Sequence, residues 1–466
     1  MFKVVELLKA TDGRLINKGA ADKVDSISID SRAVKENHAF VAIKGNNFDG
    51  HDFVGEAIKN GASCVILQLD YDNLSAKGKI KEWSRCFNNV TFIGVEDTIK
   101  ALGSIACFHR MRFRIPVIAV TGSNGKTTTK DMAAWILSAK FNVLKTDGTR
   151  NNYIGVALST LNIRNSHTAA VLELGTNHAG EISYLCSICR PTIGLITNIG
   201  PSHLEYLRDL KGVFREKYSL IENLDAPYIA VLNADDKALR IEALKKGNSK
   251  VFVLTFGLKQ KADFRAEPTK IINGKLIFSS NKHKFSIRTI GRHNVYNALA
   301  AVSIARILGM EYEDIITRAS SFIFPQGRLN VVNSDCATVI DDTYNSNPSS
   351  LNQALNALAD FKTKGRRIVV MGDMLELGDG QEGFHKRAGK DAAGVCDVLV
   401  TVGKLSRLAA KTAEACGFDT KNIFSCESSS QAKVILENEI SPKKEDVVLL
   451  KGSRRMKMEE ILNKKV

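Results

Sequence analysis

No run of about 18 apolar residues occurs in the 466-residue sequence, so a helix that spans a membrane is not expected. Proline is scarce, with 8 residues against 34 glycines, and 44% of the residues are hydrophobic, which excludes a disordered or fibrous chain. The nine cysteines are an odd number scattered along the chain, so they form no disulfide framework and suit a reducing compartment. The first residues lack a basic segment followed by an apolar core. We therefore expect a soluble, cytoplasmic protein.

Cys186 and Cys189 form one CxxC motif. A metal site would need a second such pair, and a redox pair would need its own sequence context; neither occurs here. We interpret both cysteines as structural, with metal or redox use as the alternative.

The charge balance favours anionic partners. The chain has 65 Lys and Arg against 50 Asp and Glu, a formal net charge of +15, which suits phosphorylated metabolites, nucleic acid or acidic lipid. The basic residues are spread along the chain with only short runs such as Arg454-Arg455, whereas nucleic-acid proteins usually gather them into a stripe or tail. We expect small anionic ligands and no nucleic-acid partner.

The alternation of apolar runs predicts an α/β protein, and the length favours three domains at roughly 100 to 200 residues each. Up to about residue 114, short apolar runs alternate with turns and with a helix at 53–60, which predicts a small α/β domain. From Ile115 onward, continuous apolar strands alternate with helices, which implies parallel sheets covered on both faces. The expected strands are 115–120, 169–174, 193–199, 229–233 and 251–256, followed after residue 325 by 338–341, 368–371, 398–402 and 447–450.

A glycine-rich turn follows the strand at 115–120 directly and leads into a helix-forming stretch. Its sequence is Thr121-Gly122-Ser123-Asn124-Gly125-Lys126-Thr127-Thr128-Thr129. Glycines let backbone N–H groups face phosphate oxygens, Lys126 can reach the terminal phosphates and the Thr127 hydroxyl can ligate Mg²⁺. Val120 stands where the full Walker pattern has glycine, so the match is incomplete. The turn indicates a nucleoside triphosphate with Mg²⁺; a turn that only caps a helix is the alternative.

Polar residues also end the neighbouring expected strands. Glu173 ends one, and Thr197-Asn198 end the next, which leads on to His203. The carboxyl ends of strands in an open parallel sheet face the ligand crevice, and a carboxylate there suits a hard cation that bridges phosphates. His203 is less expected as a ligand because Mg²⁺ prefers oxygen, so a hydrogen-bonded loop histidine is the alternative.

Three further positions allow two interpretations each. The periodicity around Lys217 is that of a lysine on the solvated face of an amphipathic helix. Asn294 precedes a helical run, where it could hydrogen-bond a base edge or cap the helix. The segment from Asp341 to Pro348 presents carboxylates and amides at a strand end, and Pro348 also makes a plausible helix start.

Taken together, these segments resemble the Mur ligase family of bacterial cell-wall synthesis, and the likeness covers essentially the whole chain. The missing first Walker glycine is normal in that family. The motifs that carry the resemblance, besides the glycine-rich turn, are Ser28-Ile29-Asp30-Ser31-Arg32, Gly45 to His51, Asn151 to Gly155, Glu173 to Asn177, His293 to Leu299, Asp341 to Pro348 and Met371 to Gly378.

The resemblance implies three α/β domains: a small UDP-substrate-binding domain at 1–114, a central P-loop ATP-binding domain with a parallel sheet at 115–325, and a C-terminal Rossmann-like domain at 326–466. Residues matching the family's contacts to the UDP-linked substrate are Ser31, Arg32, Asp49, Gly50, His51, Asn151 and Asn152. Those matching its ATP contacts are Gly122, Ser123, Asn124, Gly125, Lys126, Thr127, Thr128, Asn294 and Arg328.

The family moves the γ-phosphoryl group of ATP onto a peptide carboxylate, and an amine then displaces phosphate from the acyl phosphate. By resemblance, Thr127, Glu173 and His203 match Mg²⁺ sites, and Lys217 aligns with a lysine that the family carries in carbamylated form. The catalytic set would be Lys126, Lys217, His203 and Asp341, with Asp341 acting on the nucleotide or in the second step. Candidates for the amine site are Tyr344, Asn345, Asn347 and the loop from Asp373 to Gly378.

Within the family, three segments favour the joining of D-Ala-D-Ala to UDP-N-acetylmuramoyl-tripeptide: the Asp30-Ser31-Arg32 motif, Asp341 to Pro348 and Met371 to Gly378. We expect a monomer without membrane insertion. The alternatives are a sister ligase or a folylpolyglutamate synthetase-like enzyme that adds a single amino acid, a P-loop nucleic-acid motor, and a catalytically inactive nucleotide-binding regulator.

Overall fold

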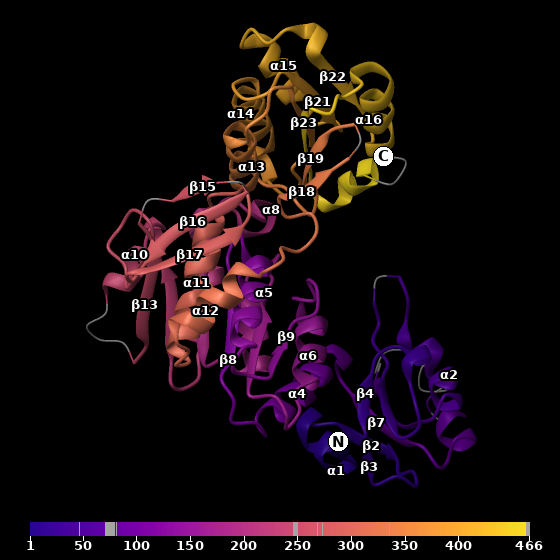
Figure 1. Ribbon diagram of the computed structural model, residues 1–466. Coiled ribbons are helices and arrows are strands. Elements are labelled where there is room, and N and C mark those ends of the chain that lie inside the picture. Colours follow the sequence, from indigo (N-terminus) through magenta and orange to yellow (C-terminus); the bar gives the residue numbers. More distant parts are fainter. Residues whose placement is uncertain are drawn as a thin grey trace. The chain divides into compact units, whose positions relative to one another are not determined.

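The structure is a computed structural model that describes residues 1–45, 47–69, 80, 82–245, 250–267, 269–272, 274–334 and 336–462 (Figure 1). Its contacts divide the chain into two compact units. The first comprises Met1–Val117, Thr146–His167 and Tyr184–Arg190, and the second comprises Ile118–Lys145, Thr168–Ser183 and Pro191–Val466. Across these described ranges, no helix is both long and apolar enough to cross a membrane.

The first unit is built on a mixed five-stranded sheet in the order β2-β7-β6-β5-β4. β2 runs antiparallel to β7, and the remaining pairs are parallel. The strands are β2 (Arg14–Asn17), β4 (Ser26–Ser28), β5 (His38–Val41), β6 (Ala62–Gln68) and β7 (Thr91–Val95), with a small β1 (Phe2–Lys3) and β3 (Lys23–Val24) pair alongside. The helices are α1 (Val4–Thr11), α2 (Val54–Lys59), α4 (Thr98–Arg110) and α6 (Tyr153–Leu161). The small α/β domain expected from the sequence is confirmed.

The second unit contains a seven-stranded sheet in the order β14-β13-β12-β11-β8-β10-β9. Its strands are β8 (Val117–Thr121), β9 (Val143–Lys145), β10 (Ala169–Glu173), β11 (Ile193–Ile196), β12 (Ile229–Asn233), β13 (Phe252–Gly257) and β14 (Phe264–Arg265). β8 and β10 are buried along their whole length, which is why their sequences are apolar without alternation. β8 lies between β11 and β10, so the polar residues at the ends of all three strands come together.

Helices and a small sheet complete this part of the unit. α5 (Lys126–Leu137) packs against α11 (Asn294–Ile307) in one large apolar core. The other elements are α8 (Leu204–Leu207), α9 (Leu210–Glu222), α10 (Lys237–Leu244), α12 (Tyr312–Ser320) and the antiparallel strands β15 (Lys270–Ile272), β16 (Lys275–Ser280) and β17 (His283–Arg288). α7 (Glu181–Cys189) begins in this unit, and its residues from Tyr184 onward belong to the first unit.

A six-stranded sheet in the order β18-β19-β23-β20-β21-β22 follows in the same unit. Val369 and Met371 of β20 belong to one apolar cluster, and Ile368 and Val370 belong to another, so successive residues face two separate cores. Helices therefore cover both faces, as the sequence predicts. The strands are β18 (Asn330–Asn333), β19 (Thr338–Asp342), β20 (Arg367–Gly372), β21 (Val398–Val402), β22 (Ile423–Cys426) and β23 (Val447–Lys451), and the helices are α13 (Pro348–Asp360), α14 (Gln381–Ala393), α15 (Arg407–Ala415) and α16 (Ser429–Ile435).

Candidate active site

The glycine-rich turn has the backbone that phosphate binding requires. Gly122 has a φ of 143°, and Gly125, which precedes α5, has a φ of 81°; both lie in the region that favours glycine. A Cβ at Gly122 would come within 1.9 Å of Oγ1 of Thr197, so a side chain has no room there. Lys126 opens α5, and its Nζ donates to the carbonyl of Gly122 at 2.7 Å. The turn therefore curls around its own lysine at a helix N-terminus, an anion-binding arrangement.

A second loop, residues 197–202, holds the turn in shape. Oγ1 of Thr197 and Nδ2 of Asn198 both donate to the carbonyl of Asn124, at 2.6 and 3.0 Å, and the Asn124 amide donates to Oδ1 of Asn198 at 3.0 Å. Oγ of Ser123 accepts from the amide of Gly200 and donates to its carbonyl, each at 2.9 Å. Sequence reasoning noted Thr197 and Asn198 only as polar strand ends, whereas the structure shows that they fix the phosphate loop.

The charged side chains around Lys126 suit the binding of a polyanion. Burial lowers the pKa of Lys126, the carboxylate of Glu173 opposes this shift, and the Arg328 guanidinium adds to it. Glu173 is 1% exposed at the end of β10, and Nη2 of Arg328 lies 3.4 Å from Oγ1 of Thr127. The second unit therefore brings together the predicted residues Lys126, Thr127, Glu173 and Arg328.

Lys217 lies inside the protein, so its interpretation as a solvated helix lysine is wrong. It is 1% exposed on α9, and burial lowers its pKa to about 7, with the nearby charge of Lys126 contributing in the same direction. Its neighbour Glu216 is also buried and accepts bonds from Thr176 and from the amides of Gly180 and Ile182. The signal was present in the sequence, because Val213, Glu216, Lys217, Leu220 and Ile221 share one helical stripe.

Asn294 belongs to a buried side-chain network rather than to a helix cap. It is the first residue of α11, and the cap position before it makes no side-chain bond. Nδ2 of Asn294 donates to Oγ1 of Thr289, its Oδ1 accepts from Asn297, and Oδ1 of Asn297 accepts from Oγ1 of Thr129. The capping alternative is therefore wrong, and the network ties Asn294 to the helix that carries the phosphate loop.

The linker before the six-stranded sheet is held by two adjacent carboxylates. Oδ2 of Asp341 accepts from the amide of Gly327 at 3.2 Å, and Oδ1 of Asp342 accepts from the amide of Leu329 at 3.2 Å. Asp342 also pairs with the buried Lys451. The Arg328 guanidinium lies 3.9 Å from the ring centroid of Tyr344, a cation–π contact. Asp341 thus holds the linker residue next to Arg328, and Tyr344 contacts the Arg328 side chain.

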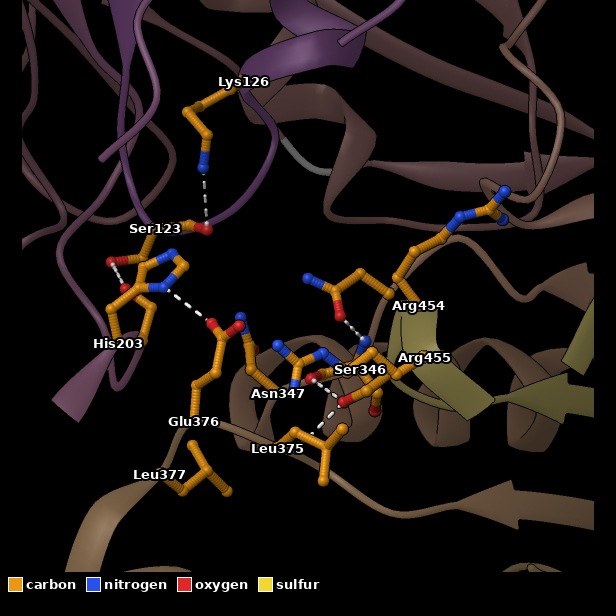
Figure 2. Close-up of a pocket in the computed structure, with 13 residues that line it drawn as sticks. Ser123, Lys126, His203, Ser346, Asn347, Leu375, Glu376, Leu377, Arg454 and Arg455 are labelled. Carbon is orange, nitrogen blue, oxygen red and sulfur yellow. Dashed lines mark hydrogen bonds and ion pairs between the residues drawn. The ribbon is translucent and has the colours of Figure 1, made fainter. Parts of the chain in front are cut away.

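A cavity of about 130 Å³ opens beside the phosphate loop (Figure 2). Its walls come from the phosphate loop, the 202–203 segment and three segments of the six-stranded part. They consist of Ser123, Lys126, Ser202, His203, Asn345, Ser346, Asn347, Leu375, Glu376, Leu377, Ser453, Arg454 and Arg455. The cavity includes two of the three predicted amine-site residues and part of the predicted loop; Tyr344 is not among the residues that line it. Sequence reasoning missed Ser453, Arg454 and Arg455, which follow β23.

Two contacts involve residues that line this cavity. Nδ1 of His203 lies 2.8 Å from Oε2 of Glu376, and this contact is the main reason that the pKa of Glu376 is lowered. Asn347 precedes α13, where its Oδ1 accepts from the amide of Ser350 and its Nδ2 donates to Oδ1 of Asn124 at 2.8 Å. The expected helix start at Pro348 is confirmed, together with a reciprocal Asn347–Ser350 capping box.

The predicted UDP-substrate residues lie in the first unit. Oγ of Ser31 donates to Glu56, and Arg32 pairs with Asp30. Asp49 and His51 contact one another at 2.6 Å, Gly50 lies between them, and Nε2 of His51 accepts from the amide of Gln68. Asn152 caps α6, directly after Asn151. Asn46 of the same motif lies outside the described residues.

Over the part of the chain that the structure describes, no group of three or more His, Cys, Asp or Glu side chains is arranged to hold a metal. The nine cysteines, all among the described residues, form no disulfide, and Cys186 and Cys189 are buried in α7, which agrees with a structural role. A cation at the phosphate loop would instead use the Thr127 hydroxyl and the Glu173 carboxylate, oxygen donors of the kind that Mg²⁺ prefers, with phosphates completing the set.

Three family models match successive parts of the chain. They describe the Mur ligase family catalytic domain at residues 23–110, the Mur ligase middle domain at 120–305 and the Mur ligase glutamate ligase domain at 327–454. The chain belongs to the Mur ligase family, with the three α/β domains that the sequence led us to expect.

Individual relatives are similar to this chain along nearly the full length of both chains. UDP-N-acetylmuramoyl-tripeptide--D-alanyl-D-alanine ligase of Bacillus subtilis is 31% identical over 443 residues, which are 94% of this chain and 92% of the relative. The crystal structure of MurF from Acinetobacter baumannii is 31% identical, with a TM-score of 0.87 over 99% of this chain and 98% of that chain. MurF ligase from Thermotoga maritima, solved in complex with ADP, is 28% identical, with a TM-score of 0.79 over 94% and 96% of the two chains.

Proposed function

We propose that this protein is an ATP-dependent ligase that joins D-alanyl-D-alanine to the peptide carboxylate of UDP-N-acetylmuramoyl-tripeptide. The product is the UDP-linked pentapeptide precursor of peptidoglycan. The observation that carries the proposal is the match to UDP-N-acetylmuramoyl-tripeptide--D-alanyl-D-alanine ligase and to MurF over nearly the whole of both chains. The domain limits that we propose are 1–114, 115–325 and 326–466.

The chemistry needs an activated carboxylate, because the oxygen of a free carboxylate is a poor leaving group. Transfer of the γ-phosphoryl group of ATP to the tripeptide carboxylate gives an acyl phosphate and ADP. The amine of the dipeptide then attacks the carbonyl carbon, the C–N bond forms, the C–O bond to phosphate breaks, and the amine loses its proton. The ADP complex of the similar Thermotoga maritima protein supports the use of ATP.

Catalysis of the first step consists mainly of positioning and charge neutralisation. Lys126 exchanges its contact with the Gly122 carbonyl for the γ-phosphate, and the 197–202 loop keeps the turn rigid while it does so. Arg328 neutralises charge beside Thr127. Asn294 contacts the adenine, and Asp341 holds the linker on which Arg328 is mounted.

The donor set fits Mg²⁺, which supplies charge neutralisation of the phosphate oxygens when it is bound. Thr127, Glu173 and His203 are the residues that would hold it, together with Lys217 in carbamylated form. The burial of Lys217 supports that modification, because CO₂ adds to a neutral amine and burial favours the neutral form. The carbamate converts the amine into an oxygen donor.

The remaining substrates take the sites that the sequence indicates. Ser31, Arg32, Asp49, Gly50, His51, Asn151 and Asn152 hold the UDP-linked substrate, and the cavity beside Asn345 and Asn347 receives the dipeptide. Because the reaction uses ATP and a UDP-linked precursor, we propose that the enzyme acts in the cytoplasm. We also propose that it is a monomer.

The deciding experiment measures ADP and phosphate release with ATP, Mg²⁺ and UDP-N-acetylmuramoyl-tripeptide, with and without D-Ala-D-Ala, and identifies the product by mass. Release that depends on the dipeptide, with the pentapeptide as product, is the expected result. Release with single amino acids or folate but not with the dipeptide would assign the enzyme to another branch of ligases. No release under any combination would refute an enzymatic function.

A further inference from the structure

Residues 453–455, which follow β23, form one wall of the cavity, and no function has yet been assigned to this wall. Ser453 is buried there, and its Oγ accepts from the amide of Leu375 at 2.9 Å and donates to the carbonyl of Ser346 at 3.4 Å. These bonds anchor the segment to both neighbouring loops of the cavity. The two arginines that follow Ser453 are therefore presented from a fixed backbone.

The two arginines differ in their partners. Nη1 of Arg454 pairs with Oε1 of Glu459 at 2.8 Å, and Figure 2 shows its side chain directed away from the cavity. Arg455 has no ion pair with any residue that the structure describes, and Figure 2 shows its side chain reaching inward, toward Asn347 and Glu376. Arg455 is thus a guanidinium that faces the cavity without an ion pair of its own, because the Glu376 carboxylate in the same cavity pairs with His203.

The size and composition of the cavity limit what this guanidinium can bind. About 130 Å³ is well below the 300–1,000 Å³ usual for pockets that enclose a larger ligand. The phosphate-loop wall carries Lys126, whereas the opposite wall carries Arg455 with the apolar Leu375 and Leu377 nearby. A small ligand with an anionic end and short apolar side chains matches these walls.

We propose that Arg455 binds the C-terminal carboxylate of the incoming dipeptide and so sets the direction in which it enters. This inference rests on the proposed function. The planar guanidinium offers parallel N–H groups that match a carboxylate. A dipeptide spans about 7 Å when extended, so its amine lies toward the phosphate-loop wall, where the acyl phosphate forms. Leu375 and Leu377 contact the alanine methyl groups.

An oxyanion on Arg455 could also be a phosphoryl oxygen of ATP or of the acyl phosphate. Kinetics can distinguish the dipeptide carboxylate from a phosphoryl oxygen as the ligand of Arg455. A contact with the dipeptide changes the KM for D-Ala-D-Ala alone, whereas a contact with a phosphoryl oxygen changes the KM for ATP or lowers kcat. The comparison uses the full-length Arg455→Ala and Arg455→Lys enzymes. The control is Arg407→Ala, which removes an exposed arginine that pairs with Glu427 and does not line the cavity. All are assayed with D-Ala-D-Ala and with its C-terminal amide.

We expect Arg455→Ala to raise the KM for D-Ala-D-Ala by about tenfold to a hundredfold, with kcat and the KM for ATP within about twofold of wild type. Arg455→Lys recovers part of this loss, and the Arg407→Ala control keeps the wild-type KM for D-Ala-D-Ala. Wild type prefers the carboxylate over the amide by a similar factor, and Arg455→Ala loses this preference.

An Arg455→Ala enzyme that still prefers the carboxylate by the wild-type factor would overturn the proposal, as would a changed KM for ATP with an unchanged KM for the dipeptide. In both cases wild type still makes the pentapeptide, so the proposed function stands. Wild type that makes no dipeptide-dependent product would overturn both proposals together. Thermal unfolding of each variant shows whether a loss of activity comes from unfolding.

Discussion

Nδ2 of Asn347 donates a hydrogen bond to Oδ1 of Asn124 at 2.8 Å. One asparagine precedes α13 and the other belongs to the phosphate loop, 223 residues earlier in the chain. The same Asn347 side chain also caps α13 through the amide of Ser350. A single residue therefore stabilises a helix and links it to the nucleotide loop, and these two roles can be separated by mutation.

Replacement of Asn347 by Ala removes both roles, whereas replacement by Ser keeps the cap, because Ser caps helices about as well as Asn. We expect Asn347→Ala to lose about 1 kcal/mol of unfolding free energy and Asn347→Ser to lose little. Both variants should lose about tenfold in kcat/KM, since a small misplacement of reacting groups is costly. Urea unfolding and steady-state kinetics test this, and wild-type kinetics for Asn347→Ser would contradict it.

Gly122→Ala should disrupt the phosphate loop. The new Cβ would meet Oγ1 of Thr197 at 1.9 Å, and the φ of 143° is strained for alanine. We expect nucleotide affinity, measured by calorimetry with ADP, to fall at least about tenfold, together with a lower melting temperature. Gly55→Ala in α2 is the control, because its Cβ meets nothing within 4 Å and should leave both measurements unchanged.

The buried Lys451–Asp342 pair should show strong coupling. Lys451 is 2% exposed, and the pair is tied to the linker through the amide of Leu329. Lys451→Met leaves a buried carboxylate without its cation and should cost about 3–5 kcal/mol of unfolding free energy, as should Asp342→Asn. The double variant should recover much of this loss. Urea denaturation measures the cycle, and additive losses would show that the pair does not interact. Lys245→Ala, which breaks a surface pair with Glu242, is the neutral control.

His109 should make stability depend on pH. It is 4% exposed, its Nε2 contacts the Ile163 carbonyl at 2.9 Å, and burial lowers its pKa to about 4 from 6.5. Between these two values the unfolded chain takes up a proton that the folded chain does not, so stability falls as the pH falls from about 6.5 to 4. The loss attributable to His109 is at most about 3 kcal/mol.

The measurement is the unfolding free energy against pH for wild type and His109→Phe, a change that keeps an aromatic ring beside Phe2 and Phe113. The variant should be less stable near neutral pH, because the Ile163 carbonyl loses its partner, but its curve should be flatter. Equal slopes for wild type and His109→Phe would refute the assignment.

Lys217→Ala should abolish ligase activity while leaving the fold intact. If the native side chain is a carbamate, short carboxylic acids added to this variant should restore part of the activity by placing an oxygen anion in the space. Lys211→Ala, on the exposed face of the same helix, is the control and should stay fully active. Full activity of Lys217→Ala without any added acid would dismiss the carbamate.

The sequence predicts the elements whose pattern is local, because a buried parallel strand such as β8 carries a continuous apolar run, here residues 117–120. It does not predict β18, β3 or β14, since strands of two to four residues carry too little pattern. The phosphate loop is recognisable because glycine, lysine and threonine are adjacent in the chain. The hydrogen bonds by which Thr197 and Asn198 support this loop cannot be recognised from the sequence, because they depend on how two loops far apart in the chain meet.

The site residues also divide into those that the sequence pattern indicates and those that only the structure reveals. Asn345 and Asn347 could be proposed from the strand end that they follow, and both line the cavity. Arg455 is missed because a pair of arginines in a basic protein resembles solvated surface, and only the position of β23 brings it to the cavity. Tyr344 was proposed for the amine site, but its ring faces Arg328.

The position of β23 also bears on biosynthesis. β23 is the last strand in chain order among the described residues, yet it lies in the middle of its sheet, between β19 and β20. While the ribosome is still translating residues before 447, β19 and β20 have no partner between them, and the nascent sheet exposes two unpaired apolar edges. Nonsense or frameshift alleles that stop before this strand should therefore yield aggregating or rapidly degraded products rather than partially active ones.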